Sequence, residues 1–301
     1  MRLSQITDQF KEKLEISEVV QDNDFSTLAL AVSEIDMDFC TFIDDAKYVD
    51  QISSNASMVI TTPEISSLIR AKGVCISQSP RISFFRLHNH LVGSDEYMLS
   101  KNFKTEIGHG CRISDMACIA DRNVRIGNNV IIEEFVSIKE NTIIGDNTFV
   151  GAGTVVGGDG YEFKRLPNGE VLSVKHAGWT NVGSNVEIQY NVCIDKAIYP
   201  WDATMISDFC KIDNLVHIAH GVKLGKAVFL VAGSLIGGRT IIKDRTWIGV
   251  GATISNGLIV GEGARVNIGA VATLNVEDGS AVTGNFAIEH KKFIQFIKSI
   301  G

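Results

Sequence analysis

The most polar stretch set into a six-residue repeat, residues 211–222, carries an aspartate and two histidines. His220 is a candidate general base, because an imidazole with a pKa of about 6.5 accepts a proton at neutral pH. Asp213, seven residues earlier, could orient that imidazole and stabilise its cationic form. His217 precedes a residue expected to point inward, so strand alternation predicts that it points outward at the surface. The two histidines then project to opposite sides, and no metal pair is predicted here.

A second candidate site lies near the N-terminus, in the segment 41–48. Phe42 and Tyr48 flank Asp45, and two aromatic rings around a polar residue could sandwich a planar base and read its edge. Packing in the core of a small domain is the alternative interpretation of the same residues. His88 and His90 could share a face, but no third ligand accompanies them, so no metal site is predicted.

The element that must position the first site is a repeat of six residues. The aliphatic column is formed by Ile126, Ile132, Ile138, Ile144, Val150, Val156, Val182, Ile188, Ile194, Ile206, Ile212, Ile218, Leu224, Leu230, Ile236, Ile242, Ile248, Ile254, Val260 and Val266. Ile107, Ile113 and Ile119 precede it one residue out of phase, and Pro200 leaves one gap in it. Neither a helix nor an ordinary strand has this period. A strict period of six is typical of a parallel β-helix, in which each hexapeptide forms one flat face of a coil.

The repeat divides the chain into three predicted parts. Residues 1–103 lack it and are predicted to form an α/β domain, with β-rich runs at 28–32, 39–43, 57–61, 74–77 and 82–87 and helical patches at 6–14 and 48–53. Residues 104–285 are predicted to form the β-helix, interrupted once by a loop at 157–181, whose Pro167-Asn168-Gly169 predicts a hairpin turn. Residues 286–301 are predicted to form a short amphipathic helix that covers the last rung or a neighbouring subunit, or docks a carrier protein.

The composition disfavours several classes of protein. The chain has 28 basic and 35 acidic residues, and a formal net charge of −7 argues against a broad basic surface for nucleic acid. No apolar run reaches the ~18 residues that span a membrane. The N-terminal segment has no signal-peptide core, so a cytoplasmic location is expected. The six cysteines lack zinc-ligand spacing, and Cys118, Cys193 and Cys210 are expected to be buried free thiols within the repeat.

Several of these residues match the motifs of one family. They are Phe42 and Tyr48 at a fixed spacing, the loop 158–163, Ile194-Asp195, and Asp213-Asn214 followed by Ile218-Ala219-His220, which is the most specific element. In these motifs the chain resembles the UDP-3-O-acylglucosamine N-acyltransferases of lipid A biosynthesis. The resemblance implies a mainly β fold, a homotrimer of left-handed parallel β-helices with active sites between neighbouring coils. It also implies transfer of an acyl group from a thioester to the amine of a nucleotide-linked sugar, with no permanently bound cofactor.

The resemblance assigns a role to each matching position. It implies that His220 deprotonates the amine, that Asp213 is its partner, and that the backbone N–H of Gly238 stabilises the tetrahedral oxyanion. It implies that Phe42 and Tyr48 stack on the nucleotide base. The other residues expected to bind substrate are Asp45, Asp159, Tyr161, Phe163, Asn214 and His217.

The chain also departs from the pattern of that family, which leaves the substrates open. Asp45 stands where the family has Asn, Gly257 where it has a second histidine, and 195–197 reads Asp-Lys-Ala instead of Asp-Arg-Gly. The donor is acyl-CoA or acyl carrier protein, and a tail shorter than that of the family favours acyl-CoA. The acceptor is UDP-3-O-acylglucosamine, or a dTDP- or UDP-linked amino-deoxysugar destined for a surface polysaccharide. A non-catalytic β-helix scaffold is the alternative of another class, although such a scaffold needs neither Asp213 nor His220.

Overall fold

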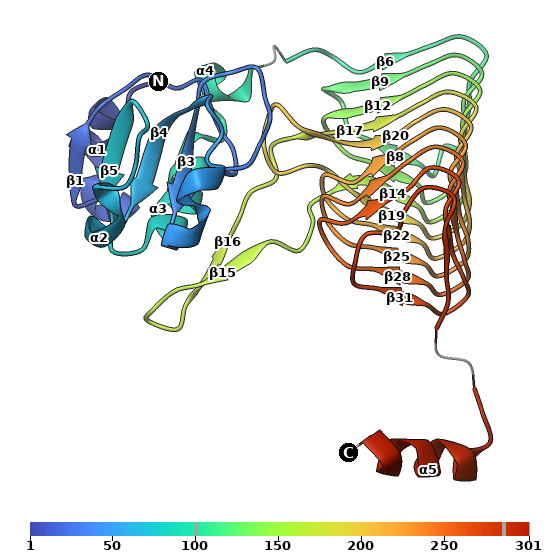
Figure 1. The fold of residues 1–301 in the computed structure, drawn as a ribbon. Helices are drawn as coiled ribbons and strands as arrows, with labels where there is room; N and C mark the ends of the chain where they lie inside the picture. The colour runs from blue at the N-terminus through green and yellow to red at the C-terminus, as the bar shows by residue number, and fades with distance from the viewer. Residues whose placement is uncertain (100–101, 285–286, 301) are drawn as a thin grey trace. The chain divides into compact units, whose positions relative to one another are not determined.

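The structure is a computed structural model that describes residues 1–99, 102–284 and 287–300. The chain forms two compact units (Figure 1). The N-terminal unit comprises Met1–Phe103, Asp159–Trp179 and Lys196–Ala203, and the coil unit comprises Lys104–Gly158, Thr180–Asp195 and Thr204–Gly301. The predicted boundary at residues 285 and 286 lies outside the described residues, as does residue 301.

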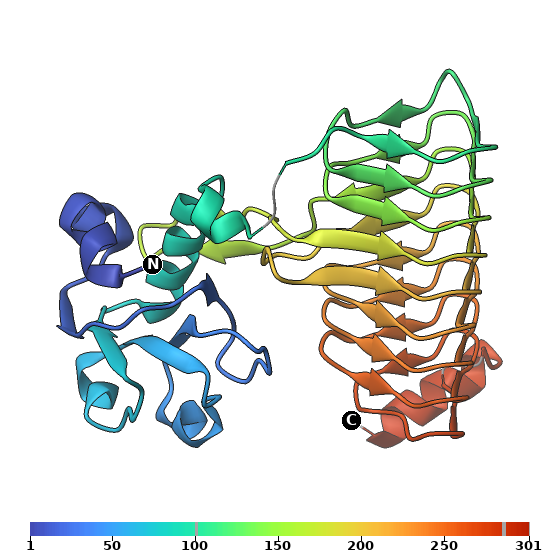
Figure 2. The same cartoon turned by 90° about the horizontal axis from the view of Figure 1, so that it is seen from above.

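The coil unit is a left-handed parallel β-helix with three sheets, which confirms the predicted fold (Figures 1 and 2). The first sheet consists of β7 (Arg112–Ile113), β10 (Ile131–Ile132), β13 (Phe149–Val150), β18 (Glu187–Ile188), β21 (Lys211–Ile212), β24 (Phe229–Leu230), β27 (Trp247–Ile248), β30 (Arg265–Val266) and β32 (Ala281–Val282). The second consists of β8 (Cys118–Ile119), β11 (Ser137–Ile138), β14 (Val155–Gly158), β19 (Cys193–Asp195), β22 (His217–Ile218), β25 (Leu235–Ile236), β28 (Thr253–Ile254) and β31 (Val271–Ala272). The third consists of β6 (Glu106–Ile107), β9 (Val124–Ile126), β12 (Thr142–Ile144), β17 (Trp179–Val182), β20 (Ala203–Ile206), β23 (Lys223–Leu224), β26 (Ile241–Ile242) and β29 (Ile259–Val260).

The aliphatic column points into the coil along all three sheets. In the first sheet Ile212 pairs with Leu230, 18 residues further on, and both side chains are buried. Each turn therefore stacks its three aliphatic residues on those of the next turn, and the core is continuous along the axis. The first turn is different: Ile107 is 51% exposed, because a terminal turn has a neighbour on one side only.

The column is interrupted twice, and the prediction of a single interruption is wrong. A regular turn pairs Ile218 with Ile236, 18 residues on, whereas Ile194 pairs with Ile218, 24 residues on. The extra six residues belong to the segment Lys196–Ala203, which leaves the coil. Because six residues equal one repeat, this insertion keeps the phase of the column, and only the gap at Pro200 marks it in the sequence.

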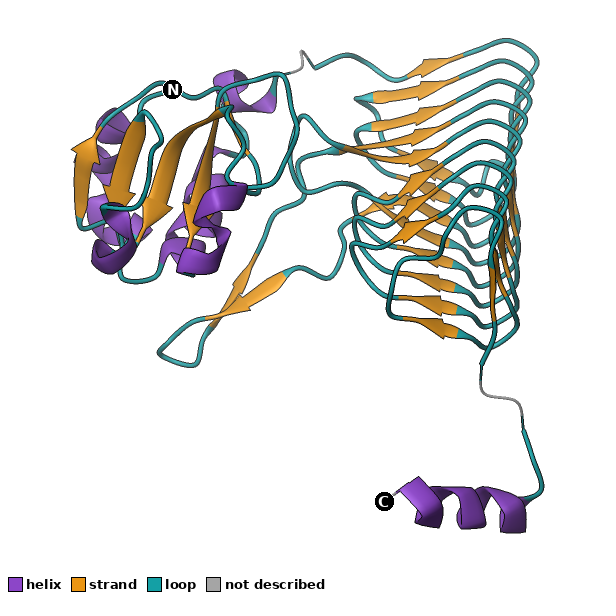
Figure 3. Cartoon of the chain, viewed as in Figure 1, coloured by secondary structure: helices purple, strands orange, loops and turns teal. Residues whose placement is uncertain are grey.

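The first insertion contains the predicted hairpin, which is confirmed. Strands β15 (Phe163–Arg165) and β16 (Val171–Ser173) pair antiparallel, with Phe163 opposite Ser173. Gly169 lies in the turn with φ at 87°, a conformation that favours glycine. Figure 3 shows the hairpin as a separate pair of strands.

The N-terminal unit is built on a five-stranded sheet of order β1-β5-β4-β3-β2, in which β1 is the antiparallel edge strand. Its elements are α1 (Leu3–Leu14), β1 (Glu18–Gln21), β2 (Thr27–Leu28), β3 (Phe39–Ile43), the 3-10 helix η1 (Ala46–Gln51), β4 (Ala56–Thr61), α2 (Pro63–Ser66), β5 (Gly73–Ile76), α3 (Pro80–Leu91) and α4 (Asp95–Met98). The β-rich run expected at 82–87 is wrong, because these residues lie inside α3. Phe84, Leu87 and Leu91 recur at helical spacing and are buried, and Pro80 occupies the first turn, where its missing N–H costs nothing.

Both insertions contribute to the core of the N-terminal unit. Val174 from the first insertion and Ile198 and Tyr199 from the second are buried in the same cluster as Phe84. The indole N–H of Trp201 donates to the carbonyl of Leu28 at 2.9 Å. The N-terminal unit is therefore discontinuous in sequence, because segments that interrupt the coil help to close its core.

A buried histidine joins α3 to the first insertion. His88 lies 2.8 Å from the carbonyl oxygen of Lys175 through Nε2 and 2.7 Å from the hydroxyl of Tyr97 through Nδ1. Since a carbonyl only accepts, Nε2 carries the proton and the Tyr97 hydroxyl donates to Nδ1. Burial lowers the pKa of His88 to about 4, so the ring is neutral at pH 7 and serves as a structural link.

The exposure of the cysteines corrects one expectation. Cys210 is buried as expected, but Cys118 and Cys193 are exposed. Each of these two directly precedes an inward residue of the column, so alternation turns its side chain outward.

The predicted C-terminal helix is α5 (His290–Ile300), and none of its described residues is buried. Its apolar residues Phe293, Phe296, Ile297 and Ile300 share one face and remain between 42% and 65% exposed. None of the helices in the described part of the chain is long and apolar enough to cross a membrane.

Candidate functional site

The candidate base lies at a corner of the coil. His220 follows β22 in the turn that leads from the second sheet to the third, and it is half-buried. The next turn of the coil stacks Gly238 beneath it, since the N–H of Arg239 donates to the His220 carbonyl at 2.9 Å. A Cβ added at Gly238 would lie 2.9 Å from Nε2 of His220. The imidazole therefore lies over the backbone of Gly238, and glycine provides the room for it.

The N–H of Gly238 is a donor that the fold leaves available. At the corner between the first and second sheets, the N–H of the second corner residue donates to a side chain from a neighbouring turn of the coil. For example, the Tyr190 N–H donates to Asn214 Oδ1 at 3.0 Å. Among the described residues no acceptor is found for the N–H of Gly238. The corner thus presents an imidazole nitrogen and an uncommitted N–H, the two groups that acyl transfer requires.

Asp213 lies at the other end of the same strand. It occupies the turn before β22, whereas His220 occupies the turn after it. Its carboxylate accepts from the N–H of Asn214 at 2.7 Å and from the N–H of Ala232 at 3.1 Å. These contacts give Asp213 a role in shaping its own corner, and its pairing with His220 stays a prediction.

His217 projects from β22 beside a buried carboxylate. Its Nε2 lies 3.7 Å from Oδ2 of Asp195, and Asp195 is only 8% exposed. The two residues come together because β22 pairs with β19, which places Cys193 opposite His217. His217 is therefore a surface residue, as predicted, and it faces an acidic group that sequence reasoning had not connected with it.

The topology explains where the repeat is interrupted. The first insertion begins after β14 and the second after β19, and both strands belong to the second sheet. The next strand of that sheet is β22, which His220 follows. In addition, the hydroxyl of Thr204, the residue after the second insertion, accepts from the N–H of Gly221 at 2.8 Å. Both insertions and the candidate base thus follow three consecutive strands of one sheet.

The three residues predicted to bind a base lie in different surroundings. Phe42 packs against Phe84 at 5.1 Å and Phe85 at 6.3 Å between ring centroids, beside the core. Asp45 caps η1, because its side chain accepts from the N–H of Lys47 at 3.0 Å and pairs with the Lys47 ammonium at 2.7 Å. The hydrogen bond from the Lys47 ammonium is the main cause that lowers the pKa of Asp45, and the bond from the Lys47 N–H is the next. Tyr48 is 41% exposed.

The predicted residues of the first insertion form an ion pair and an exposed aromatic pair. Asp159 contacts the ammonium of Lys196 at 2.9 Å, so the two insertions are joined by opposite charges. Tyr161 is 87% exposed and packs edge-on against Phe163 at 4.9 Å. Burial is the main cause that lowers the pKa of the nearby His176, with the charge of Asp159 opposing it.

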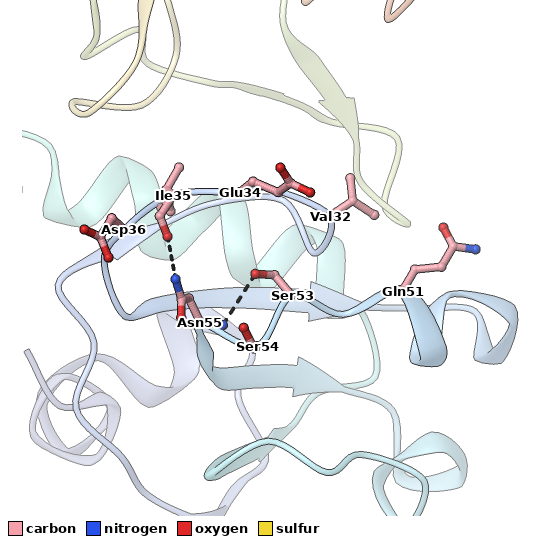
Figure 4. A pocket seen from close by; sticks show the side chains of 8 residues that line it. All are labelled: Val32, Glu34, Ile35, Asp36, Gln51, Ser53, Ser54 and Asn55. Carbon is pink, nitrogen blue, oxygen red and sulfur yellow. Dashed lines mark hydrogen bonds between the residues drawn. The ribbon is translucent and has the colours of Figure 1, made fainter.

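A cavity of about 640 Å³ opens elsewhere in the N-terminal unit (Figure 4). Its lining residues are Val32, Glu34, Ile35, Asp36, Gln51, Ser53, Ser54 and Asn55. Asn55 holds the wall in place by donating to the Ile35 carbonyl at 2.7 Å. None of these residues was predicted from the sequence. In the described parts of the chain no group of three His, Cys, Asp or Glu residues could hold a metal ion.

The repeat and the fold both have counterparts among known proteins. A family described as bacterial transferase hexapeptide (six repeats) matches residues 123–158. In the crystal structure of an Arabidopsis UDP-N-acetylglucosamine acyltransferase, the similarity covers 60% of this chain and 62% of that one, with a TM-score of 0.54 and 23% identity. The chain therefore has the fold of the hexapeptide-repeat transferases.

The sequence relatives are more specific. An enzyme named UDP-3-O-acylglucosamine N-acyltransferase 2 from Legionella pneumophila (strain Paris) is 37% identical over 144 residues, which are 47% of this chain and 41% of that protein. A UDP-3-O-acylglucosamine N-acyltransferase from Campylobacter lari is 31% identical over 134 residues, which are 44% of this chain and 41% of that protein. These matches confirm the resemblance to the UDP-3-O-acylglucosamine N-acyltransferases. The chain spans less than half the length of the relatives it matches.

Proposed function

We propose that this protein is an N-acyltransferase that moves an acyl group from a thioester to the amine of a nucleotide-linked sugar. The observation that carries the proposal is the corner at which the imidazole of His220 lies over Gly238. The ring of His220 and the uncommitted backbone N–H of Gly238 lie together at this corner. The named relatives, which are N-acyltransferases of a UDP-linked sugar, support the same chemistry.

The chemical step uses both groups in sequence. The amine nitrogen attacks the thioester carbonyl carbon while Nε2 of His220 takes the proton that the nitrogen loses. The oxyanion of the tetrahedral intermediate accepts a hydrogen bond from the Gly238 N–H, a contribution of about 2.7–4 kcal/mol per donor. The C–S bond then breaks, and the imidazolium returns its proton to the leaving thiolate. No metal or permanently bound cofactor takes part in this proposal.

The acceptor is the finer part of the proposal. Phe42 and Tyr48 are retained as residues that stack on the nucleotide base, with Tyr161, Phe163, Asp159, Asn214 and His217 as further substrate contacts. The carboxylate of Asp45 is already bonded to Lys47. This contact disfavours recognition of a uracil base by Asp45 and favours a different acceptor. We therefore propose two acceptors: UDP-3-O-acylglucosamine of the lipid A pathway, and a dTDP- or UDP-linked amino-deoxysugar for a surface polysaccharide. The proposed donor is acyl-CoA or acyl carrier protein, and the proposed location is the cytoplasm.

We extend the proposal to a homotrimer. On the outward side of the first sheet Phe229 and Trp247 are 39% and 37% exposed, with 5.7 Å between ring centroids. The guanidinium of Arg265 lies 5.6 Å from the Trp247 ring centroid. Such a row of aromatic side chains is the kind of surface that subunit contacts cover. Light scattering of the purified protein tests this part, and a monomeric mass would contradict it.

The activity is tested by His220→Ala. We expect the turnover number to fall by at least ~100-fold, which is the usual contribution of a general base, while the melting temperature changes little because the ring is half-buried at a corner. The assay follows thiol release from acyl-CoA with UDP- and dTDP-linked amino sugars. A non-catalytic scaffold would show no thiol release in the unmodified protein, and near-normal turnover in the variant would remove His220 from the reaction.

A further inference from the structure

A second cavity, of about 440 Å³, lies within the N-terminal unit and is formed by residues of α1, α3 and the first insertion. Its lining is mainly apolar, with Leu166, Val171 and Leu172 contributed by the hairpin region. A volume of this size falls in the range of cavities that hold small ligands. None of its lining residues belongs to the acyl-transfer site proposed above.

Cationic side chains gather around this apolar surface. Lys13 from α1 and Lys175 from the first insertion line the cavity together with His90 of α3. The pKa of His90 is lowered mainly by burial and further by the positive charges of Lys13 and Lys175. Both ammonium groups therefore act on the same ring. In a chain with a formal net charge of −7, this is a local concentration of positive charge.

The ammonium of Lys175 donates to the Asn89 carbonyl at 3.1 Å, and the remaining charged groups of the lining are paired or exposed. Arg86 donates to the Lys13 carbonyl at 3.0 Å and pairs with Glu15 at 2.8 Å, so its charge is already matched. Glu170 is the one acidic side chain among the lining residues, and it is exposed. Phe10 packs on His90 with 4.1 Å between ring centroids, where α1 departs from helical geometry. The ring pair adds aromatic surface beside the cations.

We propose that this cavity binds a small amphipathic carboxylate, a medium-chain fatty acid, with its carboxylate at Lys13 and Lys175 and its alkyl chain on Leu166, Val171 and Leu172. The charge of the lysines complements the head of such a ligand, and the aliphatic surface complements its chain. Because residues of α1, α3 and the first insertion all line the cavity, the ligand strengthens the contact between these parts of the N-terminal unit. The proposal stands independently of the acyl transfer.

Calorimetric titration of the full-length protein tests the site with hexanoate, octanoate, decanoate, octanol and inorganic phosphate. We expect each added methylene to tighten binding by about 3- to 4-fold, octanol to bind more weakly than octanoate, and phosphate not to bind. Phosphate that binds as well as decanoate would show a simple anion site and overturn the proposal. Absence of decanoate binding would overturn it as well.

Variants place the ligand in this cavity rather than elsewhere. Lys175→Met should weaken decanoate binding about 10-fold through loss of a charge-assisted hydrogen bond, and Leu172→Asn should remove the dependence on chain length. Glu170→Gln should tighten binding, because it removes the negative charge of the lining. Lys72→Met, at an exposed position outside the cavity, is the matched control and should leave binding unchanged. Equal decanoate affinity in the unmodified protein, Lys175→Met and Leu172→Asn would mean that the ligand binds elsewhere, and the proposal would be wrong.

Discussion

Adding a single methyl group at Gly238 should displace the candidate base without unfolding the coil. In Gly238→Ala the new Cβ would lie 2.9 Å from Nε2, 3.0 Å from Cε1 and 3.3 Å from Cδ2 of His220. These are atoms at the free end of a side chain, so the ring can move aside by rotation. Gly238 does not have a positive φ, so alanine meets no backbone strain there.

The expected loss of activity follows from these distances. An ordinary van der Waals contact between carbon and nitrogen is about 3.5–4 Å, so the ring must withdraw by roughly half an ångström or rotate away from Gly238. A displacement of about 1 Å in a reacting group costs up to ~100-fold in rate. We therefore expect the turnover number of Gly238→Ala to fall by about 10- to 100-fold, with a change in stability of less than ~1 kcal/mol.

Steady-state kinetics and thermal unfolding of four variants test this reasoning: Gly238→Ala, Gly284→Ala, His220→Ala and the double variant. Gly284→Ala is the matched control, because a Cβ there meets nothing within 4 Å, and it should behave like the unmodified protein. The double variant Gly238→Ala with His220→Ala should be no slower than His220→Ala alone, since the methyl group acts through the ring. Normal turnover in Gly238→Ala would refute the positional argument, and equal additional losses in both backgrounds would show that the methyl group acts on another group.

Three further predictions concern stability and binding. The pKa of His88 is about 4 in the folded state and 6.5 in its ordinary range, so the unfolded state binds the proton first as the pH falls. The contribution of His88 to the free energy of unfolding should be complete above pH 6.5 and decline by about 3 kcal/mol by pH 4. Urea titrations at several pH values should show a shallower decline for His88→Gln. A decline of equal slope in that variant would assign the effect to other groups. Ile236→Ala should destabilise the coil by ~2–5 kcal/mol, whereas Ile107→Ala at the half-exposed first turn should cost much less, and similar losses in denaturant titrations would contradict the column as the stabilising core. Tyr48→Ala should raise the KM for the sugar nucleotide and leave the KM for the thioester unchanged, and a change in the thioester KM instead would rule out base stacking by Tyr48.

The repeat could be predicted from the sequence because its signal is local and redundant. Each turn needs an aliphatic residue at the same three inward positions, so Ile212, Leu230 and Ile248 fall into one column whatever their neighbours are. The sequence does not reveal the insertion at Lys196–Ala203, because its length preserves the phase of that column. The sequence predicts a strand at residues 82–87, which belong to α3. Pro80 and the helical spacing of Phe84, Leu87 and Leu91 are weak signals beside a short apolar run, which is equally typical of a strand.

The candidate site shows a similar division. Its residue types are evident from the sequence, since His220 and Asp213 stand in the most polar stretch set into the repeat. Their surroundings are not, because contacts such as that of Asp195 with His217 depend on which strands pair. Likewise, only the packing of α3 beside β3 shows that Phe42 lies against Phe84.

The sequence by itself determined the coil, its core and the chemical groups it carries, because a period of six has one structural solution and side-chain chemistry is a property of the residue type. Only the tertiary structure decided which groups meet. The stacking of consecutive turns brings His220 over Gly238, which lies eighteen positions later. It also places the carboxylate of Asp213 where it accepts hydrogen bonds from the backbone N–H groups of its own corner. Segments that leave the coil help to close the core of the N-terminal unit, because burial of Val174, Ile198 and Tyr199 depends on surfaces from distant parts of the chain.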